Sequence, residues 1–150
     1  MNILRAVNED IPQLGKLLGI LFTQEVEFTP DESAQSNGLR EIIENPSIGD
    51  IFVAKENNEI IGTVNLLYSV STALGGKVAI LEDMIVKPVS RGKGVGSALL
   101  NHAISHANLT GCKRISLLTD SSNQSAQNLY RKHGFRKSTM VLFRHQLSTT

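Results

Sequence analysis

Apolar and polar residues follow two rhythms along this chain, one typical of strands and one typical of helices. Residues 2–7 predict a first strand. The stretch that follows has leucines three and four positions apart, which predicts a helix capped by Asp10 and containing Leu14, Leu17, Leu18 and Leu21. A second helix is predicted to begin at 31–33 and to end at 45–46, where Asn-Pro cannot continue it.

A hairpin is predicted next. Its strands lie at 50–55 and 60–68, and a polar turn centred on Asn-Asn at 57–58 joins them. After a Gly-Gly turn, residues 78–86 form an apolar run that two acidic residues interrupt. We expect this run to be the central strand of the sheet.

The second half of the chain alternates helices and strands. A helix is predicted from about Gly94 to Asn108, a strand at 114–119, a helix at 122–133 and a last strand at 140–145. A strand, helix and strand in succession favour a parallel pair. We therefore expect one α/β domain over residues 1–150, with a mixed sheet, antiparallel in its first half, and helices on its faces.

Composition narrows the classes of partner. The formal net charge is +1 at pH 7, so there is no global electrostatic case for nucleic acid or a membrane surface. Cys112 is the only cysteine, which excludes an internal disulfide and fits a reducing compartment. With no leader-like or membrane-spanning apolar run, a cytoplasmic location is expected, and a homodimer is left open.

The clearest chemical signal follows the central strand. Val86 ends the apolar run, and a basic turn with Arg91, Lys93 and three glycines leads into the next helix. Unpaired N–H groups at a helix start, the helix dipole and two cations together favour a bound phosphate or pyrophosphate. A purely structural turn is the alternative reading.

Missing residues narrow the phosphate ligand. A nucleoside-triphosphate loop needs Gly-Lys followed by Ser or Thr, and that spacing is absent. A dinucleotide fingerprint needs a third glycine, but Ser97 or Leu99 stands there, depending on the first glycine chosen. The pattern that remains is Arg-x-x-Gly-x-Gly, from Arg91 to Gly96.

Two motifs make the chain resemble the GNAT superfamily of acetyl-CoA-dependent N-acetyltransferases. The first is the Arg-x-x-Gly-x-Gly turn at 91–96, and the second is Asn-x-x-Ala-x-x-Leu-Tyr-x-x-x-Gly-Phe at 123–135. The order of elements along nearly the whole chain is also similar. The resemblance implies a three-layer fold whose central parallel strand pair splays apart at a slot for the cofactor, acetyl-CoA.

The resemblance also assigns residues to coenzyme A. It implies that backbone N–H groups of the turn hold the pyrophosphate and that the end of the central strand contacts the pantetheine arm. Asn123 matches a position that faces the coenzyme in the family. The implied cofactor-binding residues are Met84, Ile85, Val86, Arg91, Gly92, Lys93, Gly94, Val95, Gly96, Ser97, Asn123 and Tyr130.

Acetyl transfer to an amine needs a base, an oxyanion donor and a proton for the leaving thiolate. Glu82 and Asp83 are the base candidates, and Glu82 is favoured because residues 81–86 resemble the corresponding strand of amino-sugar phosphate acetyltransferases. The N–H of Ile85 or Met84 is the expected oxyanion donor. Tyr130 is the expected acid. The alternatives are ion-paired acids at a strand bend and a tyrosine that only packs in the core.

Other residues support weaker hypotheses. His102 and His106 are spaced for a metal, but without a third ligand a packed or solvated pair is expected, and no metal is predicted. Cys112 is expected to be a structural thiol. Arg144 could meet an anionic acceptor or pair with an acid on the surface.

The acceptor is the least determined part. The loop at 22–31, the second helix and the segment 68–77 are expected to select it, and the acidic residues Glu25, Glu27, Asp31 and Glu32 favour a cationic amine. A small-molecule amine is predicted, attacking the thioester directly. A protein or peptide amine, and a sensor that binds acyl-CoA without catalysis, are the alternatives.

Overall fold

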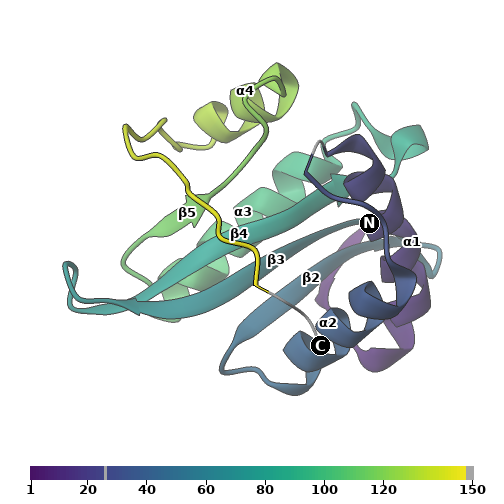
Figure 1. Ribbon diagram of the computed structural model, residues 1–150. Coiled ribbons are helices and arrows are strands. Elements are labelled where there is room, and N and C mark those ends of the chain that lie inside the picture. Colours follow the sequence, from purple (N-terminus) through teal and green to yellow (C-terminus); the bar gives the residue numbers. More distant parts are fainter. Residues whose placement is uncertain (26, 148–150) are drawn as a thin grey trace.

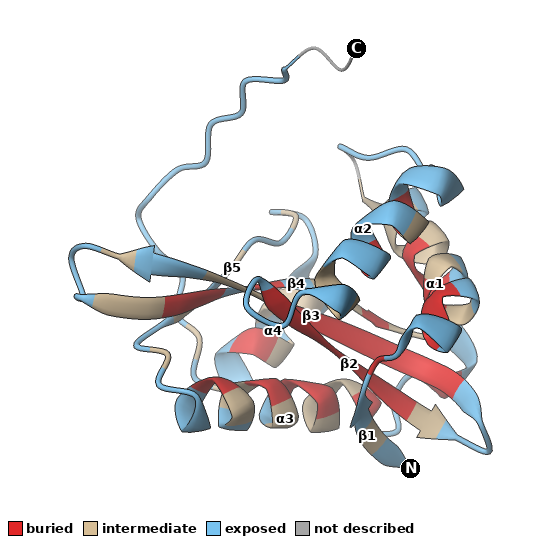
Figure 2. Ribbon diagram, turned by 90° about the horizontal axis from the view of Figure 1, so that it is seen from below, coloured by how far each residue is buried: buried red, intermediate tan, exposed pale blue. Residues whose placement is uncertain are grey.

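Residues 1–25 and 27–147, which the computed structural model describes, form a five-stranded sheet with helices on both faces (Figures 1 and 2). The strands are β1 (Asn2–Arg5), β2 (Gly49–Glu56), β3 (Glu59–Ser71), β4 (Gly76–Val86) and β5 (Ile115–Leu117). The helices are α1 (Ile11–Gln24), α2 (Glu32–Glu44), α3 (Val95–Leu109) and α4 (Gln124–Lys132), with short 3₁₀ turns η1 (Asn8–Asp10) and η2 (Pro88–Ser90). Residue 26 of the predicted acceptor loop lies outside the described residues.

The sheet has the mixed topology that the sequence predicts. The strand order is β1-β2-β3-β4-β5; the first four strands are antiparallel, and β4 and β5 are parallel. The hairpin turn holds Asn57 and Asn58 at φ of 52° and 63°, the left-handed conformation that such a turn requires and that asparagine tolerates.

The central strand β4 is irregular where the two acids interrupt it. Thr63 pairs with Ile85 but Asn65 pairs with Glu82, so β4 contains one extra residue, and Asp83 has a φ of 52°. A bulge of this kind redirects side chains beside a site. On the other side, β4 pairs with β5 only at 79–81, so the rest of β4 has no partner on that side among the described strands.

Each face of the sheet buries its own core. Phe52, Leu66 and Leu99 belong to the cluster between the sheet and α3, while Leu14 and Val53 belong to the cluster under α1 and α2. Phe52 and Val53 point to opposite faces because side chains alternate along a strand. Full burial of each such side chain contributes about 1.5–3 kcal/mol. Three layers result, as Figure 2 shows.

The prediction of a last strand at 140–145 is wrong. The segment forms no strand, and Met140, Val141 and Phe143 are largely exposed. Figure 2 shows it running away from the sheet. An apolar β-branched pattern favours a strand but does not supply an edge to pair with, and β5 offers only three residues, from 115 to 117.

Candidate active site

The glycine turn connects β4 to α3 through η2. Gly92 and Gly94 have φ of 77° and 82°, and Gly94 is the residue before the helix. Ala98 donates the first helical bond, to the Gly94 carbonyl, so the N–H groups of residues 95–97 precede the hydrogen-bonded part of α3. Free N–H groups at the start of a helix are the feature on which the predicted phosphate site depends.

The two cations of this turn, Arg91 and Lys93, are exposed, and Arg91 is hydrogen-bonded to the strand before it. Arg91 donates from Nε to the Val86 carbonyl at 3.0 Å, which holds its guanidinium against the end of β4. Lys93 and Gly92 are exposed beside it, and Val95 is buried beneath the turn. The positive charge of the turn is therefore open to solvent.

Gly96 lies close to the end of β4. A Cβ atom built there would lie 3.4 Å from Met84 Cε and 3.7 Å from Val86 Cγ2, which is ordinary contact. Packing within the protein therefore does not require glycine at this position. Met84 and Val86 are half-buried, and Ile85 is buried on the opposite face, under α1 and α2.

The starts of α3 and α4 contain two further predicted cofactor residues. Ser97 Oγ lies 3.2 Å from His133 Nε2, and the Nδ1 atom of that histidine lies 3.0 Å from Asn101 Oδ1. Asn123 caps α4, accepting from the Ala126 N–H at 3.1 Å. Ser97 thus contacts the end of α4, and the Asn123 oxygen is engaged within its own helix.

Asp83 is the acid that the bulge turns toward α1 and α2. Its Oδ2 atom accepts a 2.9 Å hydrogen bond from Asn65 Nδ2, and Asn65 is buried on β3. Burial, followed by the negative charges of Glu82 and Glu25, raises the pKa of Asp83 from 3.8 to about 7. This value suits a general base at neutral pH.

A cluster of negative charge surrounds Asp83. Glu82 is exposed, and Glu25, at the end of α1, is half-buried. Burial raises the pKa of Glu25, and the charges of Asp120, Glu82 and Glu27 raise it further. Acids from α1, β4 and the segment after β5 therefore converge, and such a cluster attracts cations.

Tyr130 lies across from this cluster on α4. Its ring is buried and packs edge-on against Phe135, with 5.9 Å between ring centroids. Burial and the charge of Glu25 raise the pKa of Tyr130 to about 12. The phenol therefore keeps its proton at neutral pH and can donate it in a hydrogen bond.

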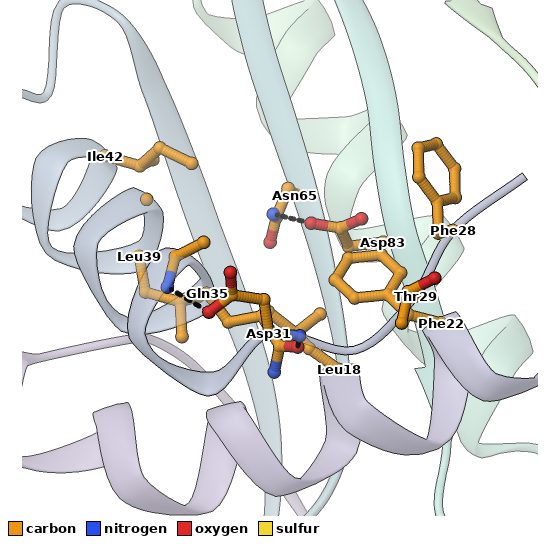
Figure 3. Close-up of a pocket in the computed structure, with 12 residues that line it drawn as sticks. Leu18, Phe22, Phe28, Thr29, Asp31, Gln35, Leu39, Ile42, Asn65 and Asp83 are labelled. Atoms are coloured by element: carbon orange, nitrogen blue, oxygen red, sulfur yellow. Dashed lines mark hydrogen bonds between the residues drawn. The ribbon is translucent and has the colours of Figure 1, made fainter. Parts of the chain in front are cut away.

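A cavity of about 270 Å³ lies on the α1 and α2 side of the bulge (Figure 3). Asn65 and Asp83 form its floor on the sheet, and Phe22 and Phe28 lie to one side of Asp83 in the close-up. The remaining lining residues come from α1, α2 and the segment between them, and they are Leu18, Thr29, Asp31, Ala34, Gln35, Gly38, Leu39 and Ile42.

The model of the Acetyltransferase (GNAT) family matches residues 16–135. The chain belongs to the GNAT family. It is therefore an acetyl-CoA-dependent acetyltransferase. An uncharacterized N-acetyltransferase of Bacillus subtilis strain 168, YhfO, is 32% identical over 142 residues, covering 93% of this chain and 92% of that protein.

Two other acetyltransferases are similar to this chain, one in sequence and one in fold. The aminoalkylphosphonate N-acetyltransferase of Salmonella typhimurium LT2 is 23% identical over 133 residues, covering 89% of this chain and 83% of that protein. A predicted acetyltransferase of Clostridium acetobutylicum, crystallised with acetyl-CoA, has the same fold. Its TM-score is 0.79 at 20% identity, and the match covers 96% of this chain and 95% of that one.

Sequence reasoning missed several residues of this GNAT site. Asn65 sits inside an apolar strand pattern, and a buried asparagine opposite an acidic interruption is the signal that could have identified it. Phe28 and Gln35 line the cavity, but nothing in the local pattern distinguishes them from ordinary helix and loop residues. Their placement depends on how α1 and α2 pack.

The weaker candidates lie elsewhere. His102 and His106 pack edge-on against Phe52, and His106 Nε2 lies 3.0 Å from Asp50 Oδ2. No cluster of three metal-ligating side chains occurs in residues 1–25 and 27–147. Cys112 is half-buried against the α3-side core.

Among residues 1–25 and 27–147, no helix combines the length and apolar character needed to cross a membrane.

Proposed function

We propose that this protein transfers the acetyl group of acetyl-CoA to the primary amine of a small molecule bound in the Asp83 cavity, by direct attack on the thioester. One observation carries the proposal: a partly open, mostly apolar cavity ends on a half-buried carboxylate of β4, the strand that leads into the glycine turn. A small cavity favours a metabolite-sized acceptor over a protein segment. A protein or peptide amine remains the second candidate.

Asp83 is the favoured base in this proposal. An alkyl amine, with a pKa of about 10, binds mainly as its ammonium form and must lose a proton before it attacks. Asp83 lies in the cavity and has its pKa raised toward neutrality, whereas Glu82 is exposed beside it. Glu82, the residue favoured by sequence, stays a prediction as a base acting through water.

Tyr130 and the β4 backbone complete the proposed chemistry. As the amine nitrogen bonds to the carbonyl carbon, we expect the N–H of Ile85 or Met84 to stabilise the oxyanion. The carbon–sulfur bond then breaks, and the second proton of the amine nitrogen is transferred to sulfur. Tyr130 donates a hydrogen bond to this sulfur, because a phenol of pKa about 12 does not readily give its proton to a thiolate.

The acid-rich loop supports a cationic acceptor, but its residues contribute unequally. Asp31 caps α2 by accepting from the Ala34 N–H, and Glu27 pairs with Arg144 at 2.9 Å. Glu25 is the loop acid whose charge acts on Asp83 and Tyr130. We expect Glu25→Gln to raise the KM of a cationic amine severalfold, and Glu32→Gln, at the exposed start of α2, to leave it unchanged.

The test is an acceptor screen that follows free-thiol release from acetyl-CoA. The wild type is compared with Asp83→Asn, Glu82→Gln and Tyr130→Phe, and peptides are included with the small amines. We expect small amines to be acetylated and Asp83→Asn to lower kcat/KM by about 10²–10⁴-fold. Tight coenzyme binding without transfer to any amine or peptide would contradict the proposal and favour a sensor.

A further inference from the structure

The acceptor cavity is large enough for one ring and a short chain. An apolar cavity of about 150 Å³ already holds benzene. The cavity measures about 270 Å³. It therefore accommodates an amine whose body is a single ring or a chain of about five or six carbons. A larger acceptor would have to extend beyond it.

Polar side chains at the start of α2 are already engaged by the protein. Gln35 accepts from the Asp31 N–H at 2.8 Å and donates to the Gly15 carbonyl at 3.0 Å. The Asp31 carboxylate accepts from the Ala34 N–H at 3.1 Å. Because the Asp31 carboxylate occupies this helix N-terminus, an anionic group of the acceptor would meet its negative charge there.

The remaining polar end of the cavity is at Asp83. Asn65 donates to one oxygen of its carboxylate, which leaves the other oxygen for the amine. Away from Asp83 most of the wall is apolar, and Thr29, Asp31 and Gln35 are its polar members. Phe22 and Phe28 pack with 5.6 Å between ring centroids on one side, and Leu39 lies opposite them in Figure 3.

No lysine, arginine or histidine belongs to the cavity lining among the described residues. Arg144 is the cation near its edge, with its guanidinium carbon 5.8 Å from the Phe28 ring centroid. It is paired with Glu27, and both side chains are about half exposed. Proteins bind phosphate and phosphonate groups largely through arginine and lysine, and the described lining of this cavity contains neither.

We infer that the acceptor is a primary amine whose body is apolar, of single-ring or short alkyl size, and without a phosphate, phosphonate or second ammonium group. This inference rests on the proposed function and adds the substrate class. It sets the chain apart from the aminoalkylphosphonate N-acetyltransferase that it resembles over most of its length.

The test compares kcat/KM for matched acceptors: 2-phenylethylamine, pentylamine, 1,5-diaminopentane, 2-aminoethylphosphonate and glucosamine 6-phosphate. We expect the two apolar monoamines to exceed each of the other three by at least tenfold. A phosphorus-bearing amine or the diamine exceeding both monoamines overturns the inference while leaving the proposed function intact. Absence of transfer to every amine overturns both.

Variants test whether the cavity wall causes the preference. Phe28→Ala should raise the KM for 2-phenylethylamine by about tenfold, with the KM for ethylamine unchanged, because ethylamine does not reach the ring. Leu109→Ala, on an 84% exposed side chain at the end of α3, is the matched control and should change neither. Equal effects of Phe28→Ala on both amines would overturn the assignment of this wall to the acceptor body.

Arg144→Gln tests the cation that lies near Phe28. If Arg144 is engaged by Glu27 as the geometry indicates, the variant should leave the order of acceptors unchanged. A loss of activity confined to phosphorus-bearing amines would show that Arg144 recruits an anionic acceptor, and it would overturn the inference.

Discussion

Asp83 combines an unusual backbone with an unusual environment. Its φ of 52° is rare for a residue within a strand, although aspartate tolerates it better than most. Such conformations cost about 1–3 kcal/mol and persist where the surrounding structure imposes them, often at functional sites. Here the bulge places the carboxylate in the cavity beside Asn65.

The burial of Asp83 predicts a cost in stability. Its pKa is raised from 3.8 to about 7 in the folded protein, so the free energy of unfolding falls as pH rises between these values. Asp83→Asn removes this cost, which is at most about 4 kcal/mol. By thermal unfolding, we expect the variant to have a higher Tm than the wild type at pH 8 and an equal Tm near pH 4. A lower Tm at pH 8 would contradict the burial of charge.

Tyr130 predicts a specific kinetic defect. Its proton is retained through the neutral range because its pKa is about 12, so the phenol acts as a donor at all working pH values. Tyr130→Phe should lower kcat about 100-fold and change the KM for acetyl-CoA less than threefold. Phe135 retains its aromatic neighbour, so the Tm serves as a folding control. An unchanged kcat would mean that the tyrosine only packs.

At the scale of elements, two glycines near the turn between β4 and α3 differ in what they require: Gly94 needs a left-handed backbone, and Gly96 does not. Gly94 has a φ of 82°, so alanine there is strained by about 1–2 kcal/mol, whereas Gly96 has ordinary space for a Cβ atom. We expect Gly94→Ala to lower the Tm by a few degrees. Gly96→Ala should leave the Tm unchanged and raise the dissociation constant for coenzyme A, measured by calorimetry. Unchanged binding in both variants would contradict a phosphate site in this turn.

Local signals explain which elements the sequence predicts well. The hairpin at Asn57 and Asn58, α2 with its Asp31 cap, and the glycine turn each carry a strong short-range pattern, and the structure confirms them. The segment 140–145 has the composition of a strand but lacks a paired edge, so its prediction fails. Pairing depends on distant residues, which composition does not encode.

In the proposed acceptor site, too, local sequence identifies some features, while others depend on contacts between distant segments. The sequence identifies Glu82 and Asp83 as a chemically important pair, but strand alternation alone does not reveal which carboxylate enters the cavity. A one-residue bulge in the pairing of β3 with β4 and the positive φ of Asp83 decide this. Phe28 joins the site only because α1 and α2 bring their connecting segment over the sheet.

At the scale of the whole molecule, most of the predicted cofactor residues and the proposed acceptor cavity lie on opposite faces of the sheet. The glycine turn, Ser97 and Tyr130 lie with α3 and α4, while the acceptor cavity lies under α1 and α2. Beyond Leu81, β4 does not pair with β5. Residues of β4 pack on both faces of the sheet, with Val86 on the α3 side and Ile85 on the α1 and α2 side. A cytoplasmic location and a homodimer both stay predictions.

The central claim is that Asp83 accepts the proton of an amine bound in this cavity, and the pH dependence of kcat/KM tests it most directly. For the wild type, with an apolar monoamine, kcat/KM should rise with pH through a pKa near 7, because the base form is needed. Asp83→Asn should lose this limb, while Glu82→Gln should retain it. A limb near pH 7 that survives Asp83→Asn and disappears in Glu82→Gln would contradict the account.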